Sequence, residues 1–458
     1  VRRAGRVRSG GSALRYYEQG DGFNSVGWSG DPKDAIADFN PIPLLGTLDN
    51  GTLITITDAG LADPGLGGGQ VFIGRRLLLG GHAGDRDATF NACRVAIPQP
   101  DLWPGVIAEP QAARVVLTEV AGQLEAHRDR EGGWLTLTLD SGVKLSQREW
   151  ERQFWNRCLT LLRLWTDTAL REERVQLRAN PDESWMEAIY VGERRSERLE
   201  PWKSLLRPTE LTFGMVAGAL PLFDAFAPIP DTATKHMVER VTLELAVLAN
   251  AACLEGLHRG LYPDAALFQG INKRGPIVKP AAEAAADAAI GLGVVSPEDR
   301  KATVDRLKQS FGLFNELTFA ERLRVLLPPV EAVAPGLIGQ DRDIWIREVK
   351  LARNLEAHRF AKDATKPENY EKRTDHYYQL ALSTEWVLRI SVLLLVGVDP
   401  AVLYDRLQEY EKFHFALANM DGCRFSWPGS RLEEFRTSQR PATSTAVVAP
   451  VQRGGAPG

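Results

Sequence analysis

Three residues in one short segment combine side chains that can cleave a phosphodiester bond. Arg353, Asn354 and His358 read R-N-x-x-x-H. A histidine titrates near neutral pH and can take or give a proton, whereas an arginine stays charged and can hold a phosphate. The asparagine can bond a phosphate oxygen or orient the histidine. With these groups the 2′-hydroxyl of RNA can act as the nucleophile without a metal. The segment therefore predicts cleavage to a 2′,3′-cyclic phosphate and a 5′-hydroxyl.

The spacing of Arg353 and His358 bears on how the two side chains could meet. Seven histidines occur among 458 residues, so an arginine five positions before one of them is a weak motif until the asparagine is added. On a straight helix an offset of five separates side chains by about 140° and roughly 7.5 Å along the axis. The pair therefore needs a bent helix or groups from elsewhere, which a symmetric dimer would supply. The alternative is an ordinary surface arginine near a histidine at a helix end.

Basic residues flank this segment. Lys350, Arg359 and Lys362 could contact the backbone of an RNA substrate. The alternative is a solvated helix face, because Glu348 and Asp363 dilute the positive charge.

A second pair, Glu255 and His258, has the three-residue spacing used in metal-binding helical bundles. No partner carboxylate pair accompanies it, so we expect a hydrogen bond at the core edge or a support for the active site. His376 could approach the R-N-x-x-x-H segment, or it could cap or pack a helix. We expect neither a metal nor a cofactor.

Composition narrows the class of protein. The net charge of −4 gives no general basic excess, so RNA would have to meet a local patch. Four cysteines stand far apart without zinc-type spacing, and we expect free thiols in a reducing compartment. The most apolar stretch, residues 390–398, is too short to cross a bilayer. These features predict a cytoplasmic protein with no membrane partner.

Residues 41–190 carry mostly strand patterns. Alternating or β-rich runs predict strands at 52–57, 70–73, 88–97, 134–139 and 174–177. The Asp-Asn-Gly at 49–51 and the Asp-Ser-Gly at 140–142 are typical of hairpin turns. One embedded helix is expected over about 146–165.

From about residue 211 the pattern is helical. Apolar spacing predicts helices at 237–258, 341–362 and 375–396. Thr318 and Glu321 have the spacing of a capping box that opens another helix. Pro328, Pro329 and Pro335 then predict a break.

These patterns together predict an α+β protein. An N-terminal antiparallel β-rich domain with an embedded helix is followed by a C-terminal all-α bundle. The predicted boundaries are a flexible N-terminal arm at 1–35, the β-rich domain at 36–208, the helical domain at 209–430 and a disordered tail at 431–458.

The chain resembles a known family in three stretches. The R-N-x-x-x-H segment in a helical bundle is similar to the R-x4-6-H motif of the HEPN superfamily. Residues 254–259, Leu-Glu-Gly-Leu-His-Arg, resemble the end of the first HEPN helix in the ApeA family of bacterial anti-phage proteins. Residues 45–51 and 71–74 loosely resemble the N-terminal domain of that family.

The resemblance implies a HEPN endoribonuclease of abortive-infection defence, acting on RNA, with tRNA as a candidate. It implies a homodimer or higher homo-oligomer, with catalytic roles for Arg353, Asn354 and His358. It further implies that the β-rich domain is a sensor that restrains the ribonuclease until a phage-derived trigger binds. Some HEPN proteins carry H-x-Y, but this chain has Phe360, so regulation through that tyrosine does not carry over. The alternative is a non-catalytic module that dimerises or binds nucleic acid or another partner.

Overall fold

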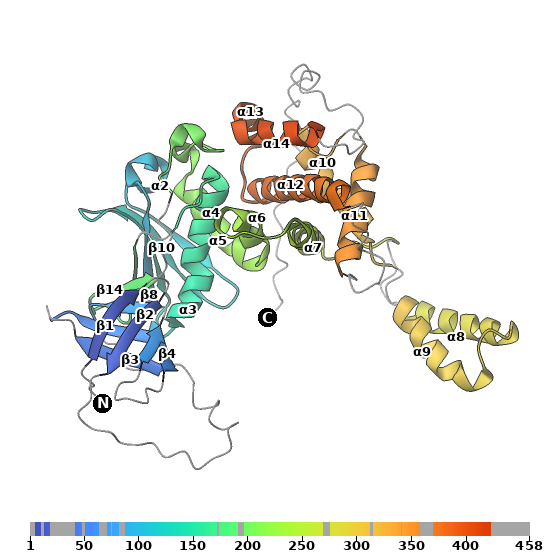
Figure 1. Cartoon of the computed structure of the whole chain (residues 1–458), viewed down its shortest axis with the longest axis horizontal. Helices are drawn as coiled ribbons and strands as arrows, with labels where there is room; N and C mark the ends of the chain where they lie inside the picture. The colour runs from blue at the N-terminus through green and yellow to red at the C-terminus, as the bar shows by residue number, and fades with distance from the viewer. Residues whose placement is uncertain are drawn as a thin grey trace, which may run out of the picture. The chain divides into compact units, whose positions relative to one another are not determined.

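The chain folds into two compact units, each described here by itself. The computed structural model describes residues 5–10, 13–18, 42–47, 51–63, 71–74, 76–81, 88–171, 174–190, 197–268, 275–311, 315–339, 341–357 and 370–422. The first unit comprises Val1–Arg240 and Val392–His414, and the second comprises Val241–Ser391 and Phe415–Gly458 (Figure 1).

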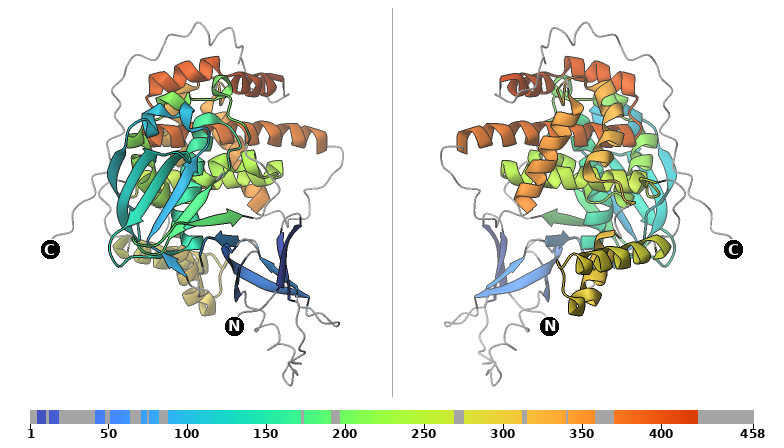
Figure 2. Two further views of the ribbon diagram at one scale, coloured as in Figure 1. Left: turned by 90° about the vertical axis from the view of Figure 1, so that its left-hand side faces the viewer. Right: turned by 90° about the vertical axis from the view of Figure 1, so that its right-hand side faces the viewer.

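An antiparallel sheet forms the centre of the first unit. Its strands are β1 (Gly5–Gly10), β2 (Ala13–Glu18), β3 (Ile42–Thr47), β4 (Leu53–Asp63), β5 (Val71–Gly74), β6 (Arg76–Leu79), β8 (Ala92–Ile97), β9 (Gln111–Val116), β10 (Ala121–Arg128), β11 (Gly133–Leu139), β13 (Val175–Arg178) and β14 (Met186–Tyr190). They follow the order β1-β2-β5-β4-β6-β14-β13-β8-β11-β10-β9, and β3 pairs with β4. Figure 2 shows the strands of the sheet side by side. The predicted N-terminal antiparallel β-rich region is therefore confirmed.

One long helix packs on this sheet, as the sequence predicts. Ser146 and Glu149 form a capping box at its start. It continues through α3 (Gln147–Trp150), the π-helical turn η2 (Glu151–Trp155) and α4 (Asn156–Thr166), and Figure 1 shows it lying against the sheet. Trp150 is fully buried and donates its indole N–H to the carbonyl of Phe90 at 3.0 Å. The buried aromatic side of the helix therefore anchors it to the strands.

Shorter elements complete the first unit. They are η1 (Pro100–Leu102), α2 (Pro104–Ile107), a two-stranded ladder of β7 (Thr89–Phe90) and β12 (Leu145–Ser146), η3 (Pro201–Lys203), η4 (Pro208–Glu210), α5 (Phe213–Ala225), α6 (Ile229–Val238) and α13 (Pro400–Glu409). Helix α5 packs against β9 and α4. Helices α5 and α6 therefore belong to the first unit, which extends to Arg240.

Two local expectations about the first unit differ from the structure. The Asp-Ser-Gly turn at 140–142 forms, with Gly142 at φ 82°, but it does not close a hairpin. It leads from β11 into β12, which pairs with β7 instead. The strands β1 and β2 lie within the first 35 residues, where the sequence predicts a loose arm. The first expectation rested on the residues of a turn and the second on the composition of a short segment. Neither shows which strands will pair, because the partners lie far away in the sequence.

The second unit is helical, as predicted. Its helices are α7 (Leu243–Leu261), α8 (Gly275–Gly291), α9 (Arg300–Phe311), α10 (Phe319–Val333), α11 (Arg342–Ala357) and α12 (Tyr370–Leu395), and α14 (Glu411–Gly422) begins in the first unit. Helix α7 packs against α10 and α11. Polar bonds join α12 to the same group, since Asn250 donates to Thr384 at 3.3 Å and Trp345 donates to Ser383 at 3.0 Å. The sheet followed by this bundle makes the chain an α+β protein.

The expected break is confirmed before Pro335, where α10 has ended, but is wrong at Pro328 and Pro329. The capping box of Thr318 and Glu321 forms as predicted, but α10 continues through both prolines to Val333. Each proline removes one backbone donor from the helix, which leaves the carbonyls of Arg324 and Val325 without their usual partners. Both of these residues are exposed, so water can solvate the two carbonyls and the helix tolerates the prolines.

The expected helix at 237–258 is also divided. Helix α6 ends at Val238, and α7 begins after Thr242, whose hydroxyl accepts the amide N–H of Leu245. Helix α12 is longer than predicted by about one turn at its start, and Gly397 at φ 88° follows it.

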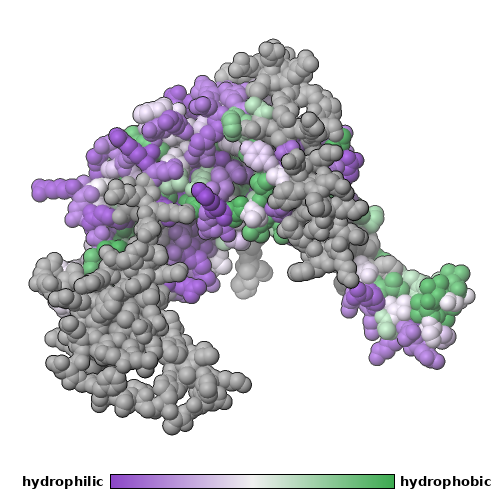
Figure 3. Space-filling model, in the orientation of Figure 1, coloured by the Kyte–Doolittle hydropathy of each residue, from purple (hydrophilic) through white to green (hydrophobic). Residues whose placement is uncertain are grey.

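Helices α8 and α9 form a hairpin with a small core of its own. Ala282, Ala286 and Val304 are buried between the two helices. At the turn Leu292 and Val294 remain 80% and 75% exposed. Figure 3 shows the hydrophobic colour gathered at the turn end of this hairpin.

Within the described ranges, no single helix has both the length and the apolar character needed to cross a membrane, whereas α5 and α6 satisfy that test only as a pair bent by 103°. Cys93, Cys158 and Cys253 are free thiols, as expected.

Candidate functional site

Helix α11 presents the R-N-x-x-x-H segment at its C-terminal end. Asp341 caps its start, because its carboxylate accepts the amide N–H groups of Asp343 and Ile344 at 2.9 and 3.0 Å. A buried stripe of Trp345, Val349 and Ala352 holds the helix against the bundle. The next position, Arg353, therefore lies at the border between the core and the solvent.

Arg353 is held by groups from two other helices. Its guanidinium Nη2 donates to Glu255 Oε2 of α7 at 2.6 Å. The same guanidinium lies over the ring of Phe319, the first residue of α10, at 4.8 Å from the ring centroid. Arg353 and Glu255 keep 31% and 17% of their side chains exposed. The arginine is therefore fixed in orientation while one side of it still faces solvent.

Glu255 and Arg353 belong to a larger set of charges on α7, α10 and α11 and in the segment just before α10. We call this set the charge cluster, and it consists of Glu255, His258, Arg259, Glu316, Arg322 and Arg353. Arg259 contacts both acids, with 3.1 Å to Glu255 and 3.5 Å to Glu316. The buried Arg322 lies 3.8 Å from Glu316. Glu321 also lies near enough to Arg322 to interact with it, so three arginines face three glutamates, and the cluster is held together by opposite charges.

His258 is the buried end of the charge cluster. Its side chain is fully buried, and Arg322 Nη1 lies 3.3 Å from its Nδ1. Because arginine can only donate, Nδ1 must accept and the ring proton must lie on Nε2. Burial lowers the pKa of His258, and the nearby Arg322 and Arg259 lower it further. His258 is therefore a neutral member of the cluster.

The structure describes only part of the segment that the sequence singles out. Asn354 and Lys350 are exposed on α11. Lys350 precedes Arg353 by three residues and Asn354 by four, so both are its neighbours on the helix surface. His358, Arg359 and Lys362 lie outside the described residues. Their catalytic and RNA-binding roles, and those of Arg353 and Asn354, stay predictions.

Glu255 and His258 support neighbouring side chains and do not act together as a pair. Glu255 contacts Arg353, and His258 contacts Arg322, so the two side chains are used by different partners. Among the described residues, no three His, Cys, Asp or Glu side chains gather closely enough to hold a metal ion.

His376 lies near α11, where it contacts Glu348 and not Arg353. Its Nε2 lies 3.8 Å from Glu348 Oε2, and its ring meets the ring of Tyr377 edge-on. Burial lowers the pKa of His376, and the nearby Glu348 opposes this effect. Of the two alternatives for His376, packing against a neighbouring helix is the one that the structure shows.

Three residues of the site carry no signal in the sequence. Phe319, Glu316 and Arg322 lie on or near the start of α10, about 35 residues before Arg353. Phe319 reads as a core residue, and Arg322 as a helix-surface cation. Only the capping box, which fixes where α10 begins, hints that position 319 has a defined orientation.

Comparison with known protein families matches the helical region. Residues 248–401 match the family described as Apea-like HEPN. This range contains the whole charge cluster and the Arg353 segment. No curated protein and no solved structure matches the chain. Because the match begins at residue 248, the likeness of residues 45–74 to the N-terminal domain of the family stays a prediction.

We predict that Glu255 and Arg353 stabilise each other. A double-mutant cycle with Glu255→Gln and Arg353→Met, measured by urea unfolding, should give a coupling free energy of about 1 kcal/mol, because the pair is only partly screened by solvent. A second cycle that pairs Glu316→Gln with Arg353→Met is the matched control. It removes the other acid of the cluster, which does not contact Arg353, and its coupling should be much smaller. Equal couplings in the two cycles would contradict the assignment.

We also predict that His258 makes the stability of the protein depend on pH. Its folded pKa is lowered, so below about pH 6.5 the unfolded chain binds a proton that the folded chain does not. The contribution of neutral His258 is therefore complete above about pH 6.5 and is lost as pH falls toward the folded pKa. Urea unfolding at pH 7.5 and 5.5 should show a smaller loss of stability for His258→Gln than for the wild type. The same loss in both proteins would show that another group titrates.

Proposed function

We propose that residues 248–401, which match the Apea-like HEPN family, form a HEPN domain and that the chain is a metal-independent endoribonuclease of anti-phage defence. The family suggests a nuclease or defence role. The finer proposal names RNA as the substrate, tRNA among the candidates, and cytoplasmic abortive infection as the setting. It assigns the chemistry to Arg353, Asn354 and His358.

The proposed reaction is an internal transfer of the phosphodiester. The 2′-oxygen attacks the adjacent phosphorus and gives its proton to His358, while the bond from phosphorus to the 5′-oxygen breaks. Arg353 stabilises the negative charge that develops on the non-bridging oxygens, and Asn354 donates to one of them. The leaving 5′-oxygen takes a proton from an acid. In a homodimer the second copy of His358 is available for that step.

The observation that carries this proposal is the setting of Arg353. Catalysis by charge requires a cation that is already oriented before the substrate arrives. Glu255 accepts a hydrogen bond from one nitrogen of the Arg353 guanidinium, and the ring of Phe319 packs against one face of it. Among the described residues, its other nitrogens make no bond, so they stay available to a phosphate. Lys350 and Asn354 flank it on the exposed surface, where they could contact the RNA backbone.

The β-rich region is assigned the regulatory part of the proposal. It lies outside the family match, and its sheet is large enough to fold around its own core. We assign it the role of a sensor that restrains the HEPN domain until a phage-derived trigger binds. The competing proposal is a non-catalytic HEPN module, which would use the arginines of the charge cluster only to bind nucleic acid or a partner.

Cleavage of total bacterial RNA and of tRNA in EDTA tests the catalytic proposal. The wild type should cleave and leave 5′-hydroxyl ends, which polynucleotide kinase can label. Arg353→Ala and His358→Ala should each lower the rate at least about 100-fold. Arg347→Ala is the matched control, because Arg347 is an exposed arginine of the same helix that pairs with Glu348, and it should retain activity.

Two outcomes would contradict the catalytic proposal. Cleavage that survives both substitutions would place the activity in other residues or in a contaminant. No cleavage by any version, even with phage lysate added as a source of trigger, would favour the non-catalytic module.

We further predict that the active form is a homodimer. Sedimentation should show a dimer, because one chain offers a single His358 for two proton transfers. An excess of His358→Ala mixed with wild type should lower the activity per wild-type chain, whereas an excess of Arg347→Ala should not. A monomer with full activity would refute this prediction.

A further inference from the structure

A pocket in the first unit lies outside the family match and has no part in the proposed reaction. It has a volume of about 600 Å³. This size suits a small ligand rather than a macromolecular surface. The segment around η3 and η4 lines one wall, and the end of α13 with the first residues of α14 lines the other. Its lining includes Leu102, Trp202, Arg207, Arg406, Tyr410 and Lys412.

Trp202 is an exposed aromatic ring in this pocket. It keeps 78% of its surface exposed, whereas six other tryptophans are fully buried. The two prolines Pro201 and Pro208 and the side chain of Leu102 provide further apolar surface in the lining. Leaving an indole in water forgoes the stabilisation that burial would give. A planar ligand that stacks on Trp202 would recover it.

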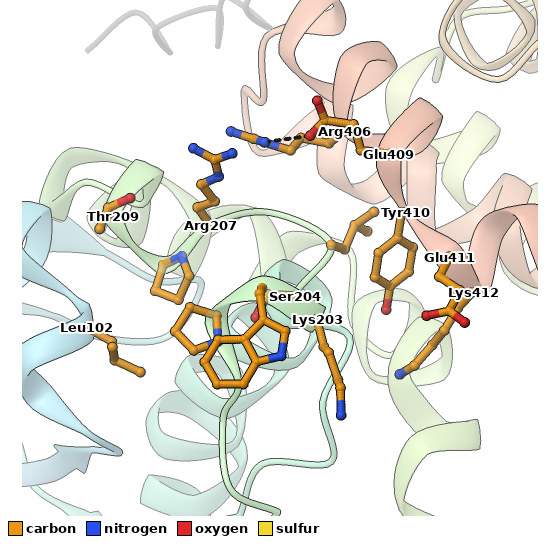
Figure 4. A pocket seen from close by; sticks show the side chains of 14 residues that line it. Leu102, Lys203, Ser204, Arg207, Thr209, Arg406, Glu409, Tyr410, Glu411 and Lys412 are labelled. Carbon is orange, nitrogen blue, oxygen red and sulfur yellow. Dashed lines mark hydrogen bonds and ion pairs between the residues drawn. The ribbon is translucent and has the colours of Figure 1, made fainter. Parts of the chain in front are cut away.

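Arg207 is a cation in this pocket without an ion-pair partner among the described residues. The other cations of the lining are engaged. Arg406 pairs with Glu210 and with Glu409, Lys412 pairs with Asp167, and Lys203 pairs with Glu200. Figure 4 shows Arg207 beside Arg406 at one end of the pocket and Lys203 and Lys412 toward the other. The lining acid Glu411 lies beside Lys412, away from Arg207, so the positive charge of Arg207 is available to an anion.

The backbone around Arg207 is fixed although its side chain is free. Its carbonyl accepts the indole N–H of Trp165 at 2.9 Å, and its amide N–H donates to Glu210 at 3.1 Å. The opposite wall is also fixed, because Tyr410 donates its hydroxyl to Asp167 and Lys412 donates to the Asp167 carbonyl at 2.9 Å. The pocket is therefore formed before any ligand enters, which lowers the entropy that binding costs.

From these features we propose that the pocket binds a mononucleotide. The base stacks on Trp202 and the phosphate is bound by Arg207. A base has the flat face that an exposed indole recognises, and a phosphate accepts two bonds from one guanidinium. A proline-rich peptide fits less well, because such grooves use several aromatic rings. The only other aromatic ring in the lining is that of Tyr410, which is buried and donates its hydroxyl to Asp167.

Calorimetric titration of the full chain with AMP, GMP, CMP and UMP tests this proposal. At least one mononucleotide should bind, and adenosine or inorganic phosphate alone should bind more weakly than AMP. Trp202→Ala should weaken nucleotide binding about tenfold or more, because it removes the stacking face. Arg207→Gln should weaken binding of AMP about tenfold but leave adenosine unchanged. Arg198→Gln, an exposed arginine outside the pocket, is the matched control and should bind as the wild type does.

Several results would overturn the proposal. These are no binding of any mononucleotide up to 10 mM (roughly the weak limit for a specific site), binding that neither substitution weakens, or binding of a polyproline peptide in place of nucleotides. The readout needs no RNA cleavage, so failure of the ribonuclease proposal would leave this test unaffected.

Discussion

The ion pair between Arg353 and Glu255 is the constraint on which the helical site depends. The two residues lie 98 positions apart, and their 2.6 Å contact requires α7 and α11 to keep one register. Helix α10 contributes Phe319 from its first turn, so the capping box that sets its start also sets where that ring lies. A shift of one residue in any of these helices would rotate the contacting side chain by about 100° and break the contact.

The charge cluster also explains why a buried histidine stays neutral. A cation at His258 would add a fourth positive charge beside Arg259 and Arg322, in a place where burial already disfavours charge. Four cations would then face the three glutamates Glu255, Glu316 and Glu321, so the neutral ring that accepts from Arg322 is the form compatible with the packing. Arg353 is the arginine of the cluster that directly precedes the exposed Asn354 in the chain.

Sequence patterns predict those parts of this structure that depend on neighbouring residues. The spacing of buried side chains gives the helices α11 and α12, and Ser146 and Thr318 mark helix starts through bonds that span three residues. Patterns fail where the outcome depends on distant groups or on solvent. The prolines of α10 do not end it, because the carbonyls that they leave unpaired lie on its exposed side. In the same way, the sequence suggests that Glu255 supports the active site. It does not show that Arg353 is the residue supported, because the two lie 98 positions apart.

The two arginines that carry the proposals are held in opposite ways, and the difference fits their roles. Arg353 has its guanidinium fixed by an acid and a ring, so little reorganisation is needed when charge develops on a phosphate, which is the condition for catalysis. Arg207 has its backbone fixed at both N–H and carbonyl while its guanidinium is free. A side chain of that kind can adapt to where a ligand places its anionic group, at the cost of some entropy on binding. Fixed charge suits a reaction whose geometry is set, and a tethered but movable charge suits recognition of a diffusing anion.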